Sequence, residues 1–273
     1  MTRVRNNGGV TEEGGYLLDN AGSQARGRFA GLEACFDRLT EGHLAARGIR
    51  PGWRCLEIGA GTGSVARWLA REVGPDGSVL ATDIDTRWTD DHGLATLEIT
   101  THDIAVDPLP GKAFDLIHGR LVVHHLPGRD AIVGRLAEAL RPGGWLVLED
   151  FDTILPHGLD PVSEEERAFV RVGSALSEAL RRHGADTTWA RTLPRRLRDA
   201  GLTEVGASGH VAIYHGGSPE SALMRANLDQ VGAAIIDAGL ITAGELANAL
   251  RLLRDPAFIS NYPLMITAWG RKP

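Results

Sequence analysis

The chain of 273 residues has only two cysteines, no long apolar run and no excess of basic charge. Cys35 and Cys55 lack the spacing of metal ligands, and nothing suggests a disulfide framework, so a reducing cytoplasm fits. Cys55 lies in an apolar segment and is expected to be buried in the core. No window approaches the ~20 apolar residues that a membrane span needs. The first residues also lack the apolar core of a secretory signal. We therefore expect a cytoplasmic protein without a membrane partner.

Acidic residues outnumber basic ones, with 35 Asp plus Glu against 29 Lys plus Arg and a formal net charge of −6. A general nucleic-acid binder needs a basic face that neutralises phosphates. The arginine cluster at 195–198 is more simply interpreted as a solvated helix face. Nucleic acid is therefore not expected as a partner of this protein.

Short apolar segments alternate with helical patterns between residues 51 and 150. The strands that this alternation predicts lie at about 53–58, 78–83, 95–100, 114–119 and 145–149. Strands that alternate with helices form a parallel sheet that is covered on both faces. Such sheets bind ligands beyond the carboxyl ends of their strands, so the segments that follow these strands should gather along one edge.

The pattern changes after residue 150. Two capping boxes, Ser163 to Glu166 and Thr242 to Glu245, begin predicted helices. Further strands are predicted at about 203–215 and 263–270. We interpret residues 1–273 as one domain, and its parts are an N-terminal helical segment 1–50, a core 51–150, and helical insertions at about 151–188 and 217–260.

Three glycines alternate with small residues directly after the first predicted strand, in Glu57-Ile-Gly-Ala-Gly-Thr-Gly63. Glycine permits positive φ and lets the backbone approach a ligand without a Cβ in the way. A dinucleotide-binding turn would have its third glycine at Ser64, and an NTPase phosphate loop would need a lysine that is absent from this turn. S-adenosylmethionine fits what remains, because Glu57 could offset its positive charge and the glycine N–H groups could take its carboxylate.

This turn resembles motif I of the class I S-adenosylmethionine-dependent methyltransferases. Four more segments resemble that family in the same order: 77–85, 102–104, 114–127 and 140–150. Five signals in order are far more specific than any one of them. The resemblance implies an α/β, doubly wound, Rossmann-like fold with a seven-stranded, mostly parallel sheet.

Asp83 lies 20 residues after Gly63 at the end of a predicted strand, where a carboxylate can accept hydrogen bonds from both ribose hydroxyls. By resemblance, Asp103 would bind the adenine amino group and Ile104 would offer its backbone N–H. A helix cap for Asp83 and a turn role for Asp103 stay open. Asp85 is interpreted as a cap or turn residue rather than a ligand, and Asp130 as the N-cap of the helix that precedes residue 140. The residues that we expect to contact the cofactor are Tyr16, Glu57, Gly59, Ala60, Gly61, Thr62, Gly63, Asp83, Ile84, His102, Asp103, Ile104, Gly119 and Arg120.

Methyl transfer is an in-line displacement that depends on positioning and on exclusion of water. The candidates for a general base are His124 and His125, after the fourth strand, with His125 slightly ahead. A structural role is equally open for each. Weaker candidates for substrate contacts are Arg28 and the strand-five acids Glu149, Asp150 and Asp152. No residue spacing requires a metal, so none is assigned.

We therefore interpret the chain as a methyltransferase that acts on O, N or C of a small molecule, in bacterial secondary metabolism. By resemblance, the two helical insertions form a substrate cap, although a larger core or a homodimer interface stays open. Alternative functions are a cyclase or isomerase that uses the sulfonium as a fixed charge, a nicotinamide-dependent oxidoreductase, or a non-enzymatic binding module.

Overall fold

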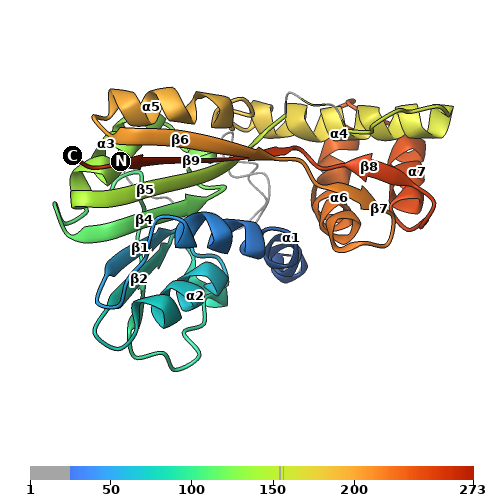
Figure 1. The fold of residues 1–273 in the computed structure, drawn as a ribbon. Coiled ribbons are helices and arrows are strands. Elements are labelled where there is room, and N and C mark those ends of the chain that lie inside the picture. Colours follow the sequence, from blue (N-terminus) through green and yellow to red (C-terminus); the bar gives the residue numbers. More distant parts are fainter. Residues whose placement is uncertain (1–24, 154, 156) are drawn as a thin grey trace, which may run out of the picture.

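The computed structural model describes residues 25–153, 155 and 157–273, and it contains a seven-stranded sheet with helices on both faces (Figure 1). The strand order is β3-β2-β1-β4-β5-β9-β6. β1 to β5 are parallel, whereas β9 is antiparallel to both β5 and β6. The strands are β1 Arg54–Ile58, β2 Ser78–Asp83, β3 Leu97–Thr101, β4 Phe114–Arg120, β5 Leu140–Asp152, β6 Thr203–His210 and β9 Leu264–Arg271. The prediction of a mostly parallel Rossmann-like sheet is confirmed.

Two helix layers cover the sheet. On one face, α3 (Arg129–Ala139) and α5 (Leu193–Asp199) pack their apolar side chains against Leu56 and Ile58. On the other face, α2 (Ser64–Val73) and the end of α1 (Ala25–Ala45) pack against Cys55 and its neighbours. Because side chains alternate along a strand, β1 contributes to both cores. The predicted burial of Cys55 is confirmed.

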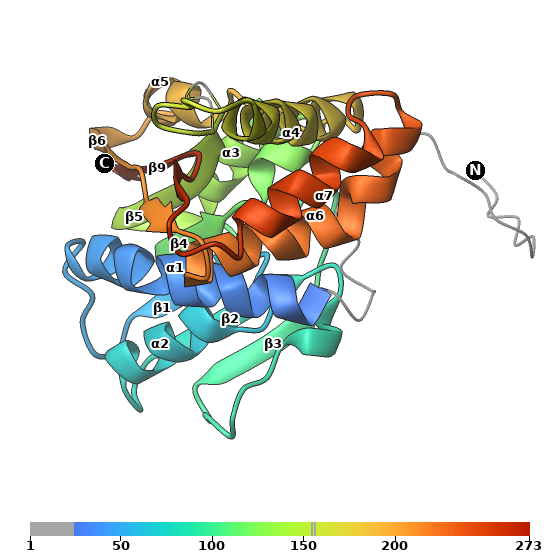
Figure 2. The same cartoon turned by 90° about the vertical axis from the view of Figure 1, so that its right-hand side faces the viewer.

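The two helical insertions lie side by side beyond one end of the sheet, at the right of Figure 1. They comprise α4 (Glu164–Arg182), α6 (Pro219–Asp237) and α7 (Ala243–Leu252), and α6 lies beside α1 in Figure 2. Together with α1 these helices form a third apolar core. A two-stranded sheet of β7 (Ile213–His215) and β8 (Ile259–Asn261) belongs to this part. The prediction of one strand at 203–215 was therefore wrong. The segment leaves the main sheet after His210, because Tyr214 is buried in the core of the insertions.

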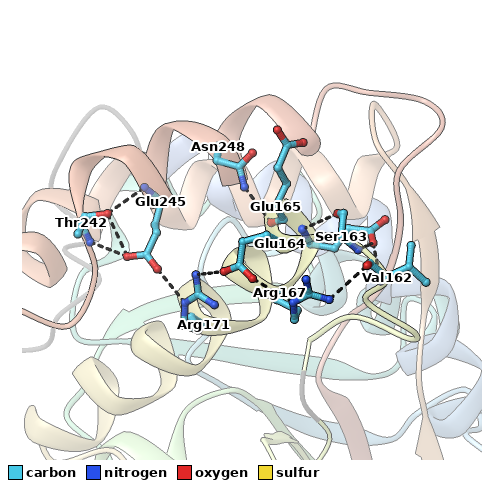
Figure 3. Close-up of polar contacts among 10 residues, drawn as sticks. Val162, Ser163, Glu164, Glu165, Arg167, Arg171, Thr242, Glu245 and Asn248 are labelled. Atoms are coloured by element: carbon cyan, nitrogen blue, oxygen red, sulfur yellow. Dashed lines mark hydrogen bonds and ion pairs between the residues drawn. The ribbon is translucent and has the colours of Figure 1, made fainter.

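Both predicted capping boxes are present. Ser163 and Glu166 begin α4, and Thr242 and Glu245 begin α7. Figure 3 shows that Glu245 also accepts a hydrogen bond from Arg171 of α4, at 2.8 Å, so the two insertions are joined across their surface. Exposed ion pairs contribute little to stability because water screens them, so the shared apolar core rather than the charges holds the helices together.

The start of α3 differs from the prediction. Asp130 is not the N-cap, because Gly128 occupies that position with φ of 69°. Asp130 instead lies in the first turn and forms an ion pair with Arg196 of α5. A negative charge in the first turn still stabilises the helix through its dipole.

Two short 3-10 turns lie after β2 and β4. One of them, Thr86–Trp88, is capped by Asp85, whose side chain accepts a hydrogen bond from the backbone N–H of Arg87. The expected cap or turn role of Asp85 is confirmed. The other, Val123–His125, follows β4 and carries both candidate bases.

Candidate active site

A cavity of about 430 Å³ follows the carboxyl ends of the parallel strands and continues under the insertions. Of the residues predicted to contact the cofactor or to act as a base, thirteen line this cavity: Glu57, Gly59, Ala60, Gly61, Thr62, Asp83, Ile84, His102, Asp103, Ile104, Arg120, His124 and His125. Gly63 and Gly119 do not belong to its described wall. Gly63 precedes α2, and Gly119 packs against Ile58. Tyr16 lies outside the described residues.

The glycine turn has the backbone that its sequence predicts. Gly59 and Gly61 adopt φ of 64° and 55°, in the left-handed region that other residues rarely enter. A Cβ on Gly59 would lie 2.1 Å from Cγ2 of Val122. Both glycines line the cavity, so the turn presents bare backbone to it.

Asp83 binds the same turn from the neighbouring strand. Its Oδ2 accepts a hydrogen bond from the N–H of Gly61 at 3.0 Å, and its Oδ1 accepts one from the N–H of Asp85 at 3.1 Å. Burial raises the pKa of Asp83, which the backbone N–H groups partly counteract. The carboxylate is thus held at the cavity wall in a defined orientation.

Asp103 combines a turn role with a place in the wall. Its Oδ1 accepts a hydrogen bond from the N–H of Ala105 at 2.9 Å, which is the turn role left open above. Ile104 beside it is buried, and His102 joins the turn to β2 by donating its backbone N–H to the carbonyl of Asp83. These residues directly follow β3 and line the cavity there.

Glu57 has a partner that the sequence analysis missed. Its Oε2 lies 2.7 Å from Nδ1 of His118, and Nε2 of the same ring lies 3.4 Å from Oε2 of Glu149. His118 is fully buried in β4. Burial opposes its charge, but the two carboxylates outweigh that effect and raise the pKa of His118 to about 9. The sequence feature that could have revealed this contact is a histidine directly after the apolar residues Leu116 and Ile117 of a predicted strand.

Glu149 and Arg120 fasten this group to α1. Glu149 accepts hydrogen bonds from Thr40 at 2.5 Å and from Thr267 at 2.7 Å. Arg120 donates to Thr40 at 2.9 Å and to Asp37 at 2.8 Å. Burial opposes ionisation of Glu149, but His118 in particular lowers the pKa of Glu149 to about 2. Both side chains are therefore committed to holding α1 on the sheet.

The two candidate bases differ in their surroundings. Nδ1 of His124 lies 2.6 Å from Oδ1 of Asp150, and both residues are buried. The His125 ring packs against His124, with 3.6 Å between ring centroids. Burial, together with the nearby His124, Arg28 and Arg129, lowers the pKa of His125 well below its usual value. An oriented histidine and a neutral histidine thus lie side by side.

The backbone before these histidines is strained. Leu121 has φ of 60°, which is uncommon for a residue other than glycine. Its N–H donates to the carbonyl of Glu149 at 2.8 Å. Strain of this kind persists where the surrounding structure holds it and is concentrated at functional sites.

The acids at the end of β5 are all engaged. Besides Glu149 and Asp150, Asp152 forms an ion pair with Arg191 at 2.5 Å. Within the described part of the chain, no group of three or more His, Cys, Asp or Glu side chains could hold a metal ion. Because these acids are already paired within the protein, the interpretation of them as substrate contacts gains no support.

The rest of the cavity wall includes residues of α1, β5, the segment after β4 and the insertions. Most of its side chains are apolar or aromatic: Phe29, Leu32, Leu121, Phe151, Leu176, Leu180, Met224 and Tyr262. Asn227 of α6 donates to the hydroxyl of Tyr262 at 3.2 Å. The sequence analysis did not identify these residues, because they come from segments far apart in the chain.

Comparison with known proteins identifies the class. Residues 26–206 match the family of methyltransferase domains, so the chain belongs to that family. Together with the fold and the glycine turn, this makes the protein a class I S-adenosylmethionine-dependent methyltransferase, with S-adenosylmethionine as its cofactor. Within residues 25–153, 155 and 157–273, no helix has the length and hydropathy to cross a membrane.

Two relatives show the range of similar sequences. The ubiquinone/menaquinone biosynthesis C-methyltransferase UbiE of Bordetella parapertussis is 28% identical over 214 residues, which cover 69% of this chain and 78% of that protein. Methyltransferase str3 of Strobilurus tenacellus is 30% identical over 154 residues, which cover 56% of this chain and 54% of that protein.

Solved structures share the fold at lower identity. Phosphoethanolamine N-methyltransferase 2 of Haemonchus contortus, in complex with phosphomonomethylethanolamine and S-adenosylhomocysteine, has a TM-score of 0.57 at 17% identity, covering 94% of this chain and 59% of that one. The [4+2]-cyclase SpnF has a TM-score of 0.51 at 21% identity, covering 87% and 81%. At these identities the likeness concerns the fold alone.

Proposed function

We propose that this enzyme methylates a weakly acidic hydroxyl group, or a carbon activated by one, on a compact and largely apolar small molecule. The main support is the continuous cavity that has the glycine turn at one end and the His124–Asp150 pair beside its apolar wall. The established cofactor and an oriented base thereby share one enclosed space.

In this proposal the cofactor lies over the glycine turn. Asp83 accepts hydrogen bonds from the ribose hydroxyls, and the segment 102–104 contacts the adenine. Glu57 faces the amino end of the methionine moiety, where its negative charge meets the ammonium group. Supporting this arrangement, these side chains line the same part of the cavity. The backbone of Gly59 and Gly61 approaches the cofactor closely because neither residue has a Cβ.

His124 acts as the general base. Asp150 accepts a hydrogen bond from Nδ1, so the lone pair of the neutral ring is on Nε2. As the acceptor oxygen attacks the methyl carbon in line with sulfur, Nε2 takes the hydroxyl proton and the C–S electron pair stays on sulfur. The products are the methylated acceptor, S-adenosylhomocysteine and an imidazolium that Asp150 stabilises. The proposal therefore prefers His124 to His125, the reverse of the sequence-based preference, and the pairing of His124 with Asp150 supports it.

Charges along the cavity favour an acidic acceptor over an amine. The carboxylates in the described wall belong to the cofactor side; they are Glu33, Glu57, Asp83 and Asp103. Glu33 contacts Thr62 of the glycine turn. Toward the insertions, the described wall carries histidines and Arg28 among apolar side chains. A cationic amine would lose its hydration there without gaining a carboxylate, whereas a phenolate or enolate would meet the positive charge of Arg28.

The helical insertions serve as the substrate cap. Leu176 and Leu180 of α4 and Met224 and Asn227 of α6 contribute to the cavity wall opposite the sheet. Closing the cavity with apolar side chains excludes water, which would otherwise solvate the nucleophile. A cytoplasmic setting, an acceptor from bacterial secondary metabolism and no nucleic-acid partner are part of the same proposal, in keeping with the composition of the chain.

The test combines binding with turnover. Isothermal titration calorimetry should detect S-adenosylhomocysteine, and a panel of phenols, enols and amines of similar size should be screened for transfer of labelled methyl. We expect methylated phenols or enols and one S-adenosylhomocysteine per product. Turnover of amines alone would refute the acceptor class. Product that forms without S-adenosylhomocysteine would favour a cyclase.

A further inference from the structure

We propose that His118 is a positioning residue, which holds the carboxylate of Glu57 in the cofactor pocket by bridging it to Glu149. The inference rests on the proposed contact between Glu57 and the methionine moiety of the cofactor. It adds a residue that lies outside motif I and outside the cavity wall, in the middle of the sheet.

The geometry leaves the imidazole ring little freedom. Glu57, His118 and Glu149 lie on β1, β4 and β5, which are neighbours in the sheet. Nδ1 of His118 is 2.7 Å from Glu57, and Nε2 is 3.4 Å from Glu149. All three residues are buried, with exposed fractions of 3%, 0% and 1%. A ring with a carboxylate on each nitrogen cannot rotate without breaking both contacts.

The far end of this chain of contacts is itself anchored. Both oxygens of Glu149 accept hydrogen bonds, from Thr40 of α1 and from Thr267 of β9. Arg120, Asp37 and His43 are the further charged or titratable groups around this end, and Arg120 joins Thr40 to Asp37. Glu149 is therefore held by α1 and β9 at once, so that one of these hydrogen bonds can be removed while the other still holds the carboxylate.

The charge of the ring gives this bridge its function. Two buried carboxylates without a cation between them would repel each other. The protonated ring of His118 attracts both, which holds the carboxylate of Glu57 in place at the cavity wall. The group of three then carries a single net negative charge, which complements a cofactor with a sulfonium and an ammonium group.

Two neutral substitutions separate positioning from simple stability. The amide nitrogen of His118→Asn can take the place of Nδ1 and still donate to Glu57. That of His118→Gln reaches the place of Nε2 and can donate only to Glu149. Both variants lose the positive charge and one contact. Thr267→Val serves as the control, because it removes one hydrogen bond from the Glu149 end without touching Glu57.

We expect His118→Gln to raise the Kd of S-adenosylhomocysteine and the KM of S-adenosylmethionine by about tenfold or more, with a smaller change in kcat. His118→Asn also loses the charge but keeps the contact with Glu57, so its Kd should rise clearly less than that of His118→Gln. Thr267→Val should lower stability but leave the Kd unchanged. Equal Kd values for the two His118 variants would overturn the inference. So would a Kd change in Thr267→Val as large as that in His118→Gln.

Further measurements keep the outcomes distinct. Failure of the wild type to bind S-adenosylhomocysteine would refute the proposed function itself, and an unchanged Kd in Glu57→Gln would refute the role of Glu57. If the His118 variants do not fold, ¹⁵N NMR of histidines in the wild type tests whether His118 is protonated and responds to the bound cofactor product. Among the buried histidines, we expect one with both ring nitrogens protonated at pH 8 that shifts when S-adenosylhomocysteine binds. Absence of such a signal would overturn the inference.

Discussion

Nδ1 of His124 lies 2.6 Å from Oδ1 of Asp150, although His124 belongs to a 3-10 turn after β4 and Asp150 to the neighbouring strand β5. The backbone supports the same arrangement, because Arg129 donates two hydrogen bonds to the carbonyl of His124. A buried carboxylate that fixes one ring nitrogen leaves the other with a defined direction. The pair therefore has the geometry of an oriented base.

Removal of this base should slow the chemical step. For His124→Gln we expect kcat to fall by about 10²-fold or more, because general base catalysis typically contributes that much. Asp150→Asn should also lower kcat, since the ring loses the partner that sets its tautomer. The matched control is His125→Gln, for which a smaller loss is expected. Measurement of kcat at saturating acceptor decides, and full activity of His124→Gln would exclude the base.

The position of Asp83 predicts a loss of cofactor binding on substitution. Asp83→Asn should raise the Kd of S-adenosylhomocysteine by about tenfold or more, because hydrogen bonds to a charged partner contribute about 1.5–3 kcal/mol. Asp85→Asn is the control two residues away, since Asp85 caps a short 3-10 turn and does not line the cavity. Calorimetry with both variants tests the ribose contact. Equal affinities would contradict it.

Gly59 tests the close approach of the backbone. In Gly59→Ala the new Cβ would lie 2.1 Å from Val122, in addition to the strain of a positive φ. We expect loss of cofactor binding and lower stability. Gly93→Ala is the control for backbone strain without a steric clash, because Gly93 has φ of 73° and nothing within 4 Å of its added Cβ. That control should cost about 1 kcal/mol and leave the Kd unchanged. Similar Kd values for the two variants would show that the turn tolerates a side chain.

The raised pKa of His118 predicts a pH dependence of stability. Its pKa is about 9 in the folded protein against a usual value of 6.5, so its stabilising contribution is complete below pH 6.5 and is lost as the pH rises to 9. Glu57, Glu149, Arg120, Asp37 and His43 are the charged or titratable groups around it. The full contribution of His118 to the free energy of unfolding is about 3 kcal/mol. The lowered pKa of Glu149 reflects the same pairing, so it is not counted a second time.

Urea unfolding between pH 6 and 9.5 measures this effect. The free energy of unfolding of the wild type should fall over that range, and the fall should be smaller in His118→Asn, which has no group to deprotonate at this place. Parallel curves for the two proteins would show that His118 is neutral in the folded state. The difference between the curves removes the contribution of all other titrating groups.

Local sequence was sufficient for much of the fold. The capping boxes that begin α4 and α7, the strand after Pro51-Gly52 and the turn at Gly59 and Gly61 depend on residues within a few positions of each other. Two predictions failed where distant contacts decided. Burial of Tyr214 among the insertions ended β6 early, and the preceding Gly128 displaced Asp130 as the cap of α3.

The sequence by itself determined the class of this protein, since a glycine turn, an acid 20 residues later and the order of strands and helices are all properties of a linear pattern. Only the tertiary structure decided which histidine is paired with Asp150, that His118 joins Glu57 to Glu149, and which residues of α4 and α6 close the cavity. The physical reason is that a hydrogen bond depends on distances of about 3 Å, which residues 26 to 61 positions apart acquire only when the strands pair and the helices pack.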